Sequence, residues 1–230
     1  MFIRYALEMI PDLLLSDLDI LPPKTSPRYN IAPPQKCPVI VREYRESPNI
    51  QGFQWGLLPY WAENEREGLK AVNAKVQSLT SDRRFADALG MRRCLIPATG
   101  FYQWKREKDG KKKIPYYFSS ESFATPLVFA GLWERWGSPA NRIRSCTVIT
   151  TKADEVLSPF TSQMPVVVDR ADWLAWLDPE NNDVDILLQI LGRSPGMNLK
   201  HWQVSSYVNR SAHEGERCTL PIQKAEPKPV

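Results

Sequence analysis

Polar and apolar positions alternate over short distances along this chain, and the pattern predicts many short strands rather than long helices. Twenty prolines in 230 residues support this, because proline interrupts helices and is common in turns. Strands are predicted at residues 1–7, 37–44, 53–58, 92–105 (as a hairpin), 115–118, 127–133, 144–151 and 165–168, and in a last segment that begins at Trp202. Helical patterns are predicted at residues 11–19, 78–89, 153–157, 172–177 and 184–191.

Nothing in the sequence divides the chain into separate parts. It contains no linker, no internal repeat and no low-complexity segment, and a chain of this length can bury most of its apolar surface as one domain. We therefore expect a single α+β domain over residues 1–222, with a few peripheral helices around the strands. The Pro/Lys-rich end, residues 223–230, is expected to be a disordered tail.

Gln103 lies in the segment that looks most constrained. In a strand, Phe101 and Gln103 would lie on one face, and Tyr102 and Trp104 on the other. An amide that shares a face with an aromatic ring needs a partner, because burying it unpaired costs about 1–3 kcal/mol. Gln103 is therefore either a satisfied core glutamine or part of a functional site.

The charge of the chain is mildly positive, with a net charge of +4 and a pI near 8.8. The densest cluster is residues 105–113, in which six of nine residues are basic around an Asp109-Gly110 turn signal. A solvated hairpin tip and a phosphate contact explain this cluster equally well. Net charge alone therefore does not establish a nucleic-acid partner.

Aromatic and basic residues are interleaved in a way that suits single-stranded nucleic acid, because aromatic rings stack on bases and cations bind phosphates. The residues with this pattern are Arg4, Trp55, Trp61, Lys75, Arg83, Arg84, Trp104 and Lys105. For any single tryptophan, a place in the core is the better prediction.

The cysteines and histidines do not indicate a metal site or a cofactor. Cys37, Cys94, Cys146 and Cys218 are far apart without a CxxC pair, so we expect buried free thiols in a reducing compartment. A nucleophile built from Cys218 and His213 remains a weak alternative. No signal peptide or membrane span is recognisable, which predicts a cytoplasmic protein.

Eight ordered blocks of the sequence carry a family resemblance. They are residues 1–5 (MFIRY), 28–33 (RYNIAP), 55–61 (WGLLPYW), 73–75 (NAK), 93–105 (RCLIPATGFYQWK), 129–134 (FAGLWE), 148–151 (VITT) and 164–167 (MPVV). In this order they resemble the SOS response-associated peptidase (SRAP) family, whose members shield abasic sites in single-stranded DNA as part of the DNA damage response. The resemblance implies a curved, barrel-like antiparallel β-sheet core with helices around it and a DNA channel across the sheet.

The resemblance also implies a reactive site that this chain has largely lost. In the family, a cysteine at position 2 becomes the N-terminal residue and captures the abasic-site aldehyde as a thiazolidine, assisted by an asparagine, a glutamate and a histidine. Here Asn73 is retained, whereas the other three positions hold Phe2, Gln103 and Thr161. A phenyl ring is no nucleophile, and neither the amide nor the hydroxyl titrates near neutral pH. We therefore expect a pseudoenzyme without thiazolidine formation, and the residues do not support peptidase activity.

The family's DNA-contacting positions are better preserved than its reactive ones. Arg4, Trp61 and Arg83 match them, Lys75 replaces an arginine and so keeps the charge without the bidentate fork, and Lys105 adds a further cation. Our leading hypothesis is non-covalent binding of single-stranded DNA, with or without abasic sites. The alternatives are an enzyme that forms an imine at the N-terminal amine, and a protein-interaction module in which Phe2 fills an apolar remnant of the site.

Overall fold

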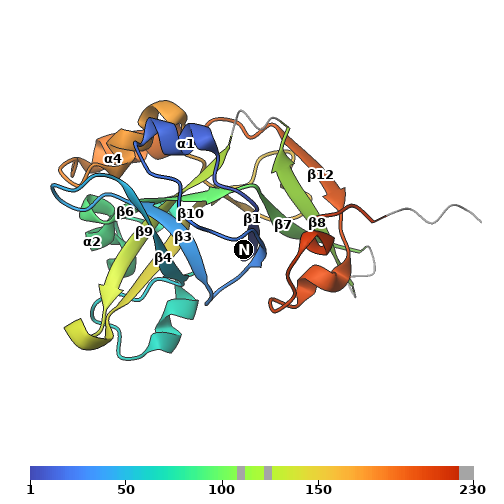
Figure 1. The fold of residues 1–230 in the computed structure, drawn as a ribbon, viewed down its shortest axis with the longest axis horizontal. Coiled ribbons are helices and arrows are strands. Elements are labelled where there is room, and N and C mark those ends of the chain that lie inside the picture. The colour runs from blue at the N-terminus through green and yellow to red at the C-terminus, as the bar shows by residue number, and fades with distance from the viewer. Residues whose placement is uncertain (108–111, 122–125, 223–230) are drawn as a thin grey trace, which may run out of the picture.

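A computed structural model describes residues 1–107, 112–121 and 126–222 (Figure 1). The strands are β1 (Tyr5–Leu7), β2 (Arg28–Ile31), β3 (Lys36–Val41), β4 (Asn49–Trp55), β5 (Asn73–Lys75), β6 (Arg93–Ala98), β7 (Gly100–Arg106), β8 (Lys113–Ser120), β9 (Leu127–Trp136), β10 (Ile143–Lys152), β11 (Gln163–Pro165) and β12 (Leu199–Gln203). The α-helices are α1 (Asp12–Asp17), α2 (Arg83–Met91), α3 (Trp173–Leu177) and α4 (Val184–Gly192). The predicted tail 223–230 and the Asp109-Gly110 turn lie outside the described residues.

Five strands close into a barrel in the order β10-β4-β3-β6-β9, because β9 pairs again with β10. An odd number of strands in a closed ring cannot alternate direction throughout, so at least one neighbouring pair must be parallel. That pair is β10 and β4, where Cys146 lies opposite Trp55, and β5 also runs parallel to β10 outside the ring. The α+β, barrel-like core is thus confirmed, with two parallel pairs in place of a fully antiparallel sheet.

A second sheet packs beside the barrel in the order β12-β8-β7-β1-β2. The hairpin predicted at residues 92–105 is wrong, because β6 belongs to the barrel while β7 pairs with β1 and β8. The chain passes between the two sheets at Gly100, which lies opposite Ala6 of β1. A Cβ atom at Gly100 would lie 2.4 Å from the Tyr117 ring and 2.5 Å from the Phe118 carbonyl oxygen, so this crossing has room only for glycine.

The helices lie on the outside of the barrel (Figure 1), and two of them, α2 and α4, begin at an aspartate that caps the helix. Asp82 accepts a hydrogen bond from the Arg84 amide at the start of α2, and Asp183 accepts one from the Asp185 amide at the start of α4. Four of the five predicted helical segments are α-helices in approximate position, and the helical turn predicted at 153–157 appears as turns over residues 155–160, with a hydrogen bond from the Ser158 amide to the Asp154 carbonyl oxygen. In the part of the chain that the structure describes, no helix is long and apolar enough to cross a bilayer.

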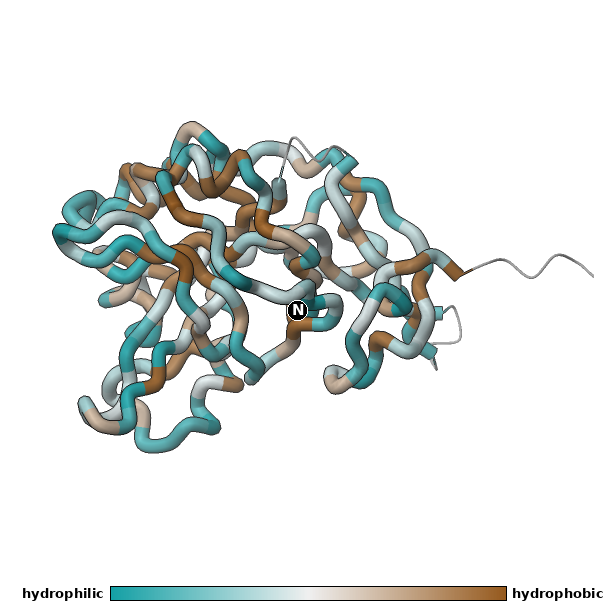
Figure 2. Tube along the Cα trace, in the orientation of Figure 1, coloured by the Kyte–Doolittle hydropathy of each residue, from teal (hydrophilic) through white to brown (hydrophobic). Residues whose placement is uncertain are grey.

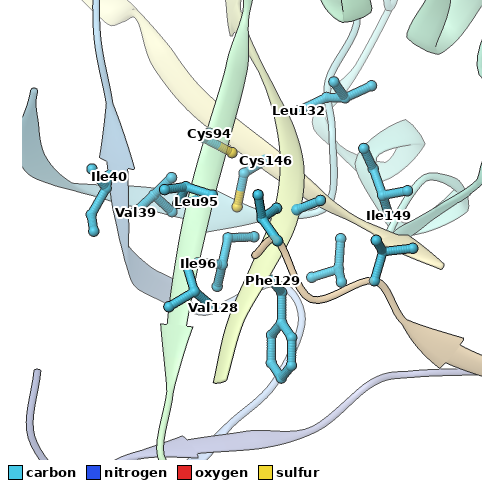
Figure 3. Packing of buried hydrophobic residues seen from close by; sticks show 14 of the residues in the cluster. Val39, Ile40, Cys94, Leu95, Ile96, Val128, Phe129, Leu132, Cys146 and Ile149 are labelled. Carbon is cyan, nitrogen blue, oxygen red and sulfur yellow. The ribbon is translucent and has the colours of Figure 1, made fainter. Parts of the chain in front are cut away.

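Buried side chains form two clusters, one on each face of the second sheet. The larger cluster fills the barrel, where β-branched and leucine side chains surround Cys94 and Cys146 (Figure 3), and the hydropathy map shows apolar segments gathered there (Figure 2). The smaller cluster contains Ala6, Tyr102, Tyr117, Val204, Val208 and Cys218. Phe101 lies in the first cluster and Tyr102 in the second, which confirms the predicted alternation in β7. The four cysteines are buried and free, as predicted.

Candidate functional site

Asn73 holds the backbone of residue 2. Its Oδ1 accepts a hydrogen bond from the Phe2 amide at 2.9 Å, and its Nδ2 donates to the carbonyl oxygens of Phe2 and Val72, each at 2.7 Å. The register of β5 against β10, with Asn73 opposite Val148, fixes the position of this side chain. Asn73 therefore holds residue 2 against the barrel wall through both its amide and its carbonyl group.

The side chain of Phe2 points into the core and is fully buried. Its ring lies 5.6 Å from that of Trp55, 5.7 Å from that of Phe101 and 5.3 Å from that of Phe129, measured between centroids. Aromatic rings in protein interiors prefer such tilted and edge-to-face arrangements, and these four rings form a close-packed group. Position 2 therefore contributes packing here and places no reactive group at the surface.

The N-terminal amine of Met1 lies next to Thr161, one of the predicted site residues. The amine donates a hydrogen bond to the Thr161 Oγ1 at 3.4 Å, and this hydroxyl in turn donates to the Gln163 carbonyl oxygen at 3.1 Å. Partial burial, followed by the charges of Lys113 and Lys75, lowers the pKa of the amine from its ordinary value of 8.0. A larger fraction of this amine is therefore neutral at pH 7 than in an unfolded chain.

A cavity of about 740 Å³, called here the N-terminal cavity, opens beside this amine. It is lined by Met1, Ile3, Arg4, Gln103, Trp104, Arg106, Lys113, Ser158, Pro159, Phe160, Thr161, Ser162 and Asn209. The fold thus brings Gln103 and Thr161 together at one cavity, although 58 positions separate them in the sequence (161 − 103). Asn73 reaches this place indirectly, through the backbone of Phe2.

Gln103 is 3% exposed, and its Nε2 finds no hydrogen-bond acceptor among the described residues. Buried polar groups in folded proteins are nearly always paired, so an unpaired amide donor needs an explanation. The structure does not provide the partner that a core glutamine would have. Its position on the wall of the N-terminal cavity favours the functional interpretation of Gln103 over the packing one.

The cations predicted to contact DNA occupy different environments. Arg4 is 8% exposed and lines the N-terminal cavity, but its Nη1 donates to the Asn30 Oδ1 at 2.8 Å and to the Val208 carbonyl oxygen at 2.7 Å. Burial lowers the pKa of Arg4. Lys75 is exposed on β5, two residues beyond Asn73. Arg4 is thus part of the internal packing, whereas Lys75 is accessible to a ligand.

Trp61, Arg83 and Lys105 lie outside the lining of the N-terminal cavity. The guanidinium carbon of Arg83 lies 4.9 Å from the centroid of the Trp61 ring in a cation–π contact, and Trp61 is partly exposed. The Lys105 Nζ lies 5.5 Å from the ring centroid of Phe160, which does line the cavity. Lys105 therefore lies close to the cavity wall.

Sequence reasoning did not single out several residues of the cavity. Arg106 and Lys113 were detectable only as members of the basic cluster 105–113, and the pairing of β7 with β8 places them opposite each other. Phe160 and Asn209 gave no signal, because they reach the cavity from segments far along the chain, a turn for Phe160 and a short 3-10 helix for Asn209. The Oδ1 of Asn209 accepts a hydrogen bond from the Trp104 Nε1 at 2.8 Å, which orients this amide.

The alternative nucleophile formed by Cys218 and His213 is not assembled. The Cys218 thiol lies 3.8 Å from the His213 backbone carbonyl oxygen, while the His213 ring stacks on Tyr207 at 3.9 Å between centroids. Burial raises the pKa of Cys218 to about 11, which keeps it protonated at neutral pH. Among residues 1–107, 112–121 and 126–222, no three His, Cys, Asp or Glu side chains come together as metal ligands would.

Comparisons with known proteins identify the family. The sequence model described as "SOS response associated peptidase (SRAP)" matches residues 1–211. The abasic site processing protein YoqW of Bacillus subtilis is 38% identical over 184 residues, which cover 80% of this chain and 81% of that protein. The abasic site processing protein HMCES of Pongo abelii is 26% identical over 238 residues, covering 87% and 67% of the two chains.

Solved structures share the fold at lower sequence identity. A protein from Bacteroides thetaiotaomicron superimposes with a TM-score of 0.78 at 16% identity, covering 96% of this chain and all of that one. A phage-related protein from Bordetella bronchiseptica gives a TM-score of 0.71 at 23% identity, with coverage of 88% and 93%. Together with the match over residues 1–211, these similarities show that the chain belongs to the SRAP family.

Proposed function

We propose that this protein binds single-stranded DNA non-covalently at the N-terminal cavity and the cations around it. The observation that carries the proposal is the makeup of the cavity itself, where Arg106 and Lys113 lie beside Gln103 and Thr161. Relatives at 38% and 26% identity are named as abasic site processing proteins, and these names support DNA as the partner of this protein. Exposed Lys75 and Lys105 extend the positive surface beyond the cavity.

The non-covalent mode follows from the side chains around the N-terminus. Phe2 offers no thiol, and its ring is fully buried. The described cysteines are all buried in the interior, and none of them lines the N-terminal cavity. The Gln103 amide cannot deliver or accept a proton as a carboxylate would, and Thr161 has no titration near neutral pH. Thiazolidine formation requires a thiol and an amine on one residue, and this chain has no such residue at its N-terminus.

The proposal is tested by fluorescence anisotropy with a labelled single-stranded oligonucleotide at several salt concentrations. We expect log affinity to fall linearly with log salt, with a slope of about −0.7 for each phosphate that is neutralised. Replacing Lys75 and Lys105 together by glutamine should make the slope shallower, whereas Lys24→Gln, an exposed lysine outside the predicted DNA-binding set, should not. The absence of any binding at low salt would contradict the proposal.

The non-covalent mode has its own measurement. After incubation with an abasic single strand and denaturation, the intact mass of the protein should equal that of the free chain. A stable adduct of protein and DNA in the mass spectrum would show that a covalent bond forms despite the loss of the cysteine.

A second candidate function is reversible imine formation at the Met1 amine. It is favoured by one observation, which is that this amine borders the N-terminal cavity with its pKa lowered by burial and by Lys113 and Lys75. In this reaction the neutral amine adds to the sugar aldehyde, water leaves, and a C=N bond forms; elimination at the β-position can then break the strand. An imine hydrolyses on denaturation, so it is compatible with an unchanged intact mass.

Borohydride separates the two candidates, because it reduces an imine to a stable secondary amine. Incubation with an abasic strand and borohydride should leave the protein unmodified if it only binds. A trapped adduct at Met1, absent with an undamaged strand of the same sequence, would establish the imine instead.

A further inference from the structure

Two side chains that line the N-terminal cavity have a buried hydrogen-bond donor without a partner among the described residues. Gln103 and Arg4 are both more than nine-tenths buried, and both line the cavity. The Gln103 Nε2 and the Arg4 Nε are buried without an acceptor among the described residues. The Arg4 guanidinium is held in the interior by Asn30 and Val208, so of these two side chains only Gln103 can turn a donor toward an oxygen-rich ligand. A half-turn of the Gln103 amide exchanges its two ends with little change in shape, so this side chain can present its donor to the cavity.

The charges around the cavity also favour an anionic ligand. Arg4, Arg106 and Lys113 line it, and no aspartate or glutamate is among its described lining residues. The charges of Lys113 and Lys75 oppose protonation of the nearby Met1 amine, and the same potential stabilises a negative charge placed there. Because position 103 holds an amide, no carboxylate at this part of the cavity wall repels an anion.

The number of cations favours a dianion over a monoanion. An internal phosphodiester of DNA carries one negative charge, whereas a terminal phosphate monoester carries about −1.5 to −2 at neutral pH. The volume of about 740 Å³ is within the range of small-molecule sites, so the cavity can hold a terminal phosphate together with its sugar. Hydroxyl groups of Ser158, Thr161 and Ser162 supply further polar surface on one side of the cavity.

We propose that the N-terminal cavity is a phosphate-monoester site that receives the phosphorylated end of a single DNA strand, with Gln103 as a donor to the phosphate. This inference rests on the proposed DNA-binding function and narrows it from any single strand to strands that end in a phosphate. The substitution of an amide at position 103 then has a consequence for binding, because a carboxylate there would repel this ligand.

The test compares three internally labelled oligonucleotides of one sequence, which end in a 5′-phosphate, in a 3′-phosphate or in hydroxyl groups at both ends. We expect one of the phosphorylated strands to bind about tenfold more tightly than the hydroxyl strand, as for a charge-assisted hydrogen-bonded contact. Inorganic phosphate, at matched ionic strength, should abolish this difference by weakening binding of the phosphorylated strand more than binding of the hydroxyl strand. Equal affinity for the three strands would overturn the inference while leaving the proposed function standing.

Variants assign the effect to the cavity. Gln103→Glu should remove the preference for the phosphorylated strand, whereas Gln189→Glu, the same change on the exposed face of α4, should keep it. Lys113→Ala, a change at an exposed side chain, should reduce the preference and serves if Gln103→Glu does not fold. A preference that survives both cavity substitutions would contradict the proposed site.

Inorganic phosphate alone provides an arm that does not depend on DNA binding. At constant ionic strength, phosphate should raise the melting temperature of the protein in a saturable way, and it should do so less in Lys113→Ala. If no oligonucleotide binds, the proposed function fails, and the phosphate site stands or falls by this saturable shift.

Discussion

At position 2, the backbone and the side chain serve different parts of the molecule. The backbone is held by two hydrogen bonds of Asn73, one to the amide and one to the carbonyl group of Phe2, and the phenyl ring completes an aromatic group in the core. A regular strand over the predicted range 1–7 would place Phe2 and Tyr5 on opposite faces, yet both rings contact Trp55. The reason is that regular strand structure begins only at Tyr5, so residues before it do not follow the period of two.

The Met1 amine allows a prediction from its pH dependence. Because burial and two lysines lower its pKa, acylation of this amine should reach half its maximal rate at a pH below 8.0. The sign follows from the reacting form: only the neutral amine is acylated, and lowering the pKa increases its fraction at a given pH. The measurement is the rate of N-terminal acylation across pH, followed by mass spectrometry of the N-terminal peptide.

The unfolded chain is the matched control for this measurement, since it has the same amine without the fold. In urea, the midpoint should return to that of an ordinary α-amine. A midpoint that is the same in the folded and the unfolded protein would mean that neither the burial nor the lysines act on the amine.

Gln103 shows how far a residue can be interpreted without coordinates. Its type and its neighbours in β7 identified a polar side chain that needs a partner, and left two explanations open. Only the fold shows that no acceptor reaches the Nε2 within the described residues and that a cavity lies beside the side chain. The cavity also depends on Thr161 and Asn209, which come from segments far along the chain whose paths the local pattern does not encode.

At the scale of elements, the crossing between β6 and β7 makes a specific demand on Gly100. Replacement by alanine would place a Cβ 2.5 Å from the Phe118 carbonyl oxygen, and a backbone atom within a sheet cannot move away easily. We expect Gly100→Ala to lower the free energy of unfolding by about 1–3 kcal/mol, the usual cost of overpacking. Urea denaturation followed by tryptophan fluorescence measures this loss.

Gly52 of β4 is the control for this prediction, because a Cβ at that position would meet nothing within 4 Å. Gly52→Ala should leave the unfolding free energy unchanged or raise it by up to about 1 kcal/mol, through the smaller entropy of the unfolded chain. Equal losses in the two variants would show that the crossing at Gly100 is not the tight contact described above.

The positions of the strands were far more predictable from the sequence than the pairing between them. Alternation and proline-bounded apolar runs are local, and they located most strands within a few residues. Pairing depends on residues distant in sequence, as when β10 joins β4 and β5 in parallel, and no local signal shows this. The wrong hairpin at residues 92–105 has the same cause, because a turn signal at residues 98–100 does not reveal whether two strands pair or enter different sheets.

At the scale of the whole molecule, the C-terminal segment returns to the first strands. Asn30 of β2 donates through its Nδ2 to the carbonyl oxygens of Val208, Arg210 and His213, and Glu214 accepts a hydrogen bond from Arg28. These contacts hold residues 205–218 against the second sheet. The N-terminal cavity, which includes Asn209, therefore depends on contacts between the two ends of the described chain.

Replacement of Arg4 can distinguish the stabilising effect of these C-terminal contacts from an effect on DNA binding. Arg4→Gln removes the donor to the Asn30 Oδ1 and to the Val208 carbonyl oxygen, so we expect the unfolding free energy to fall by about 2–3 kcal/mol. Hydrogen exchange should also increase over residues 205–218, because this segment loses its central contact. Arg106→Gln, a change at an exposed side chain of the same cavity, should weaken DNA binding while altering stability by no more than about 0.5 kcal/mol. An Arg4→Gln protein as stable as the parent, with a loss of DNA affinity equal to that of Arg106→Gln, would show instead that Arg4 acts directly on the nucleic acid.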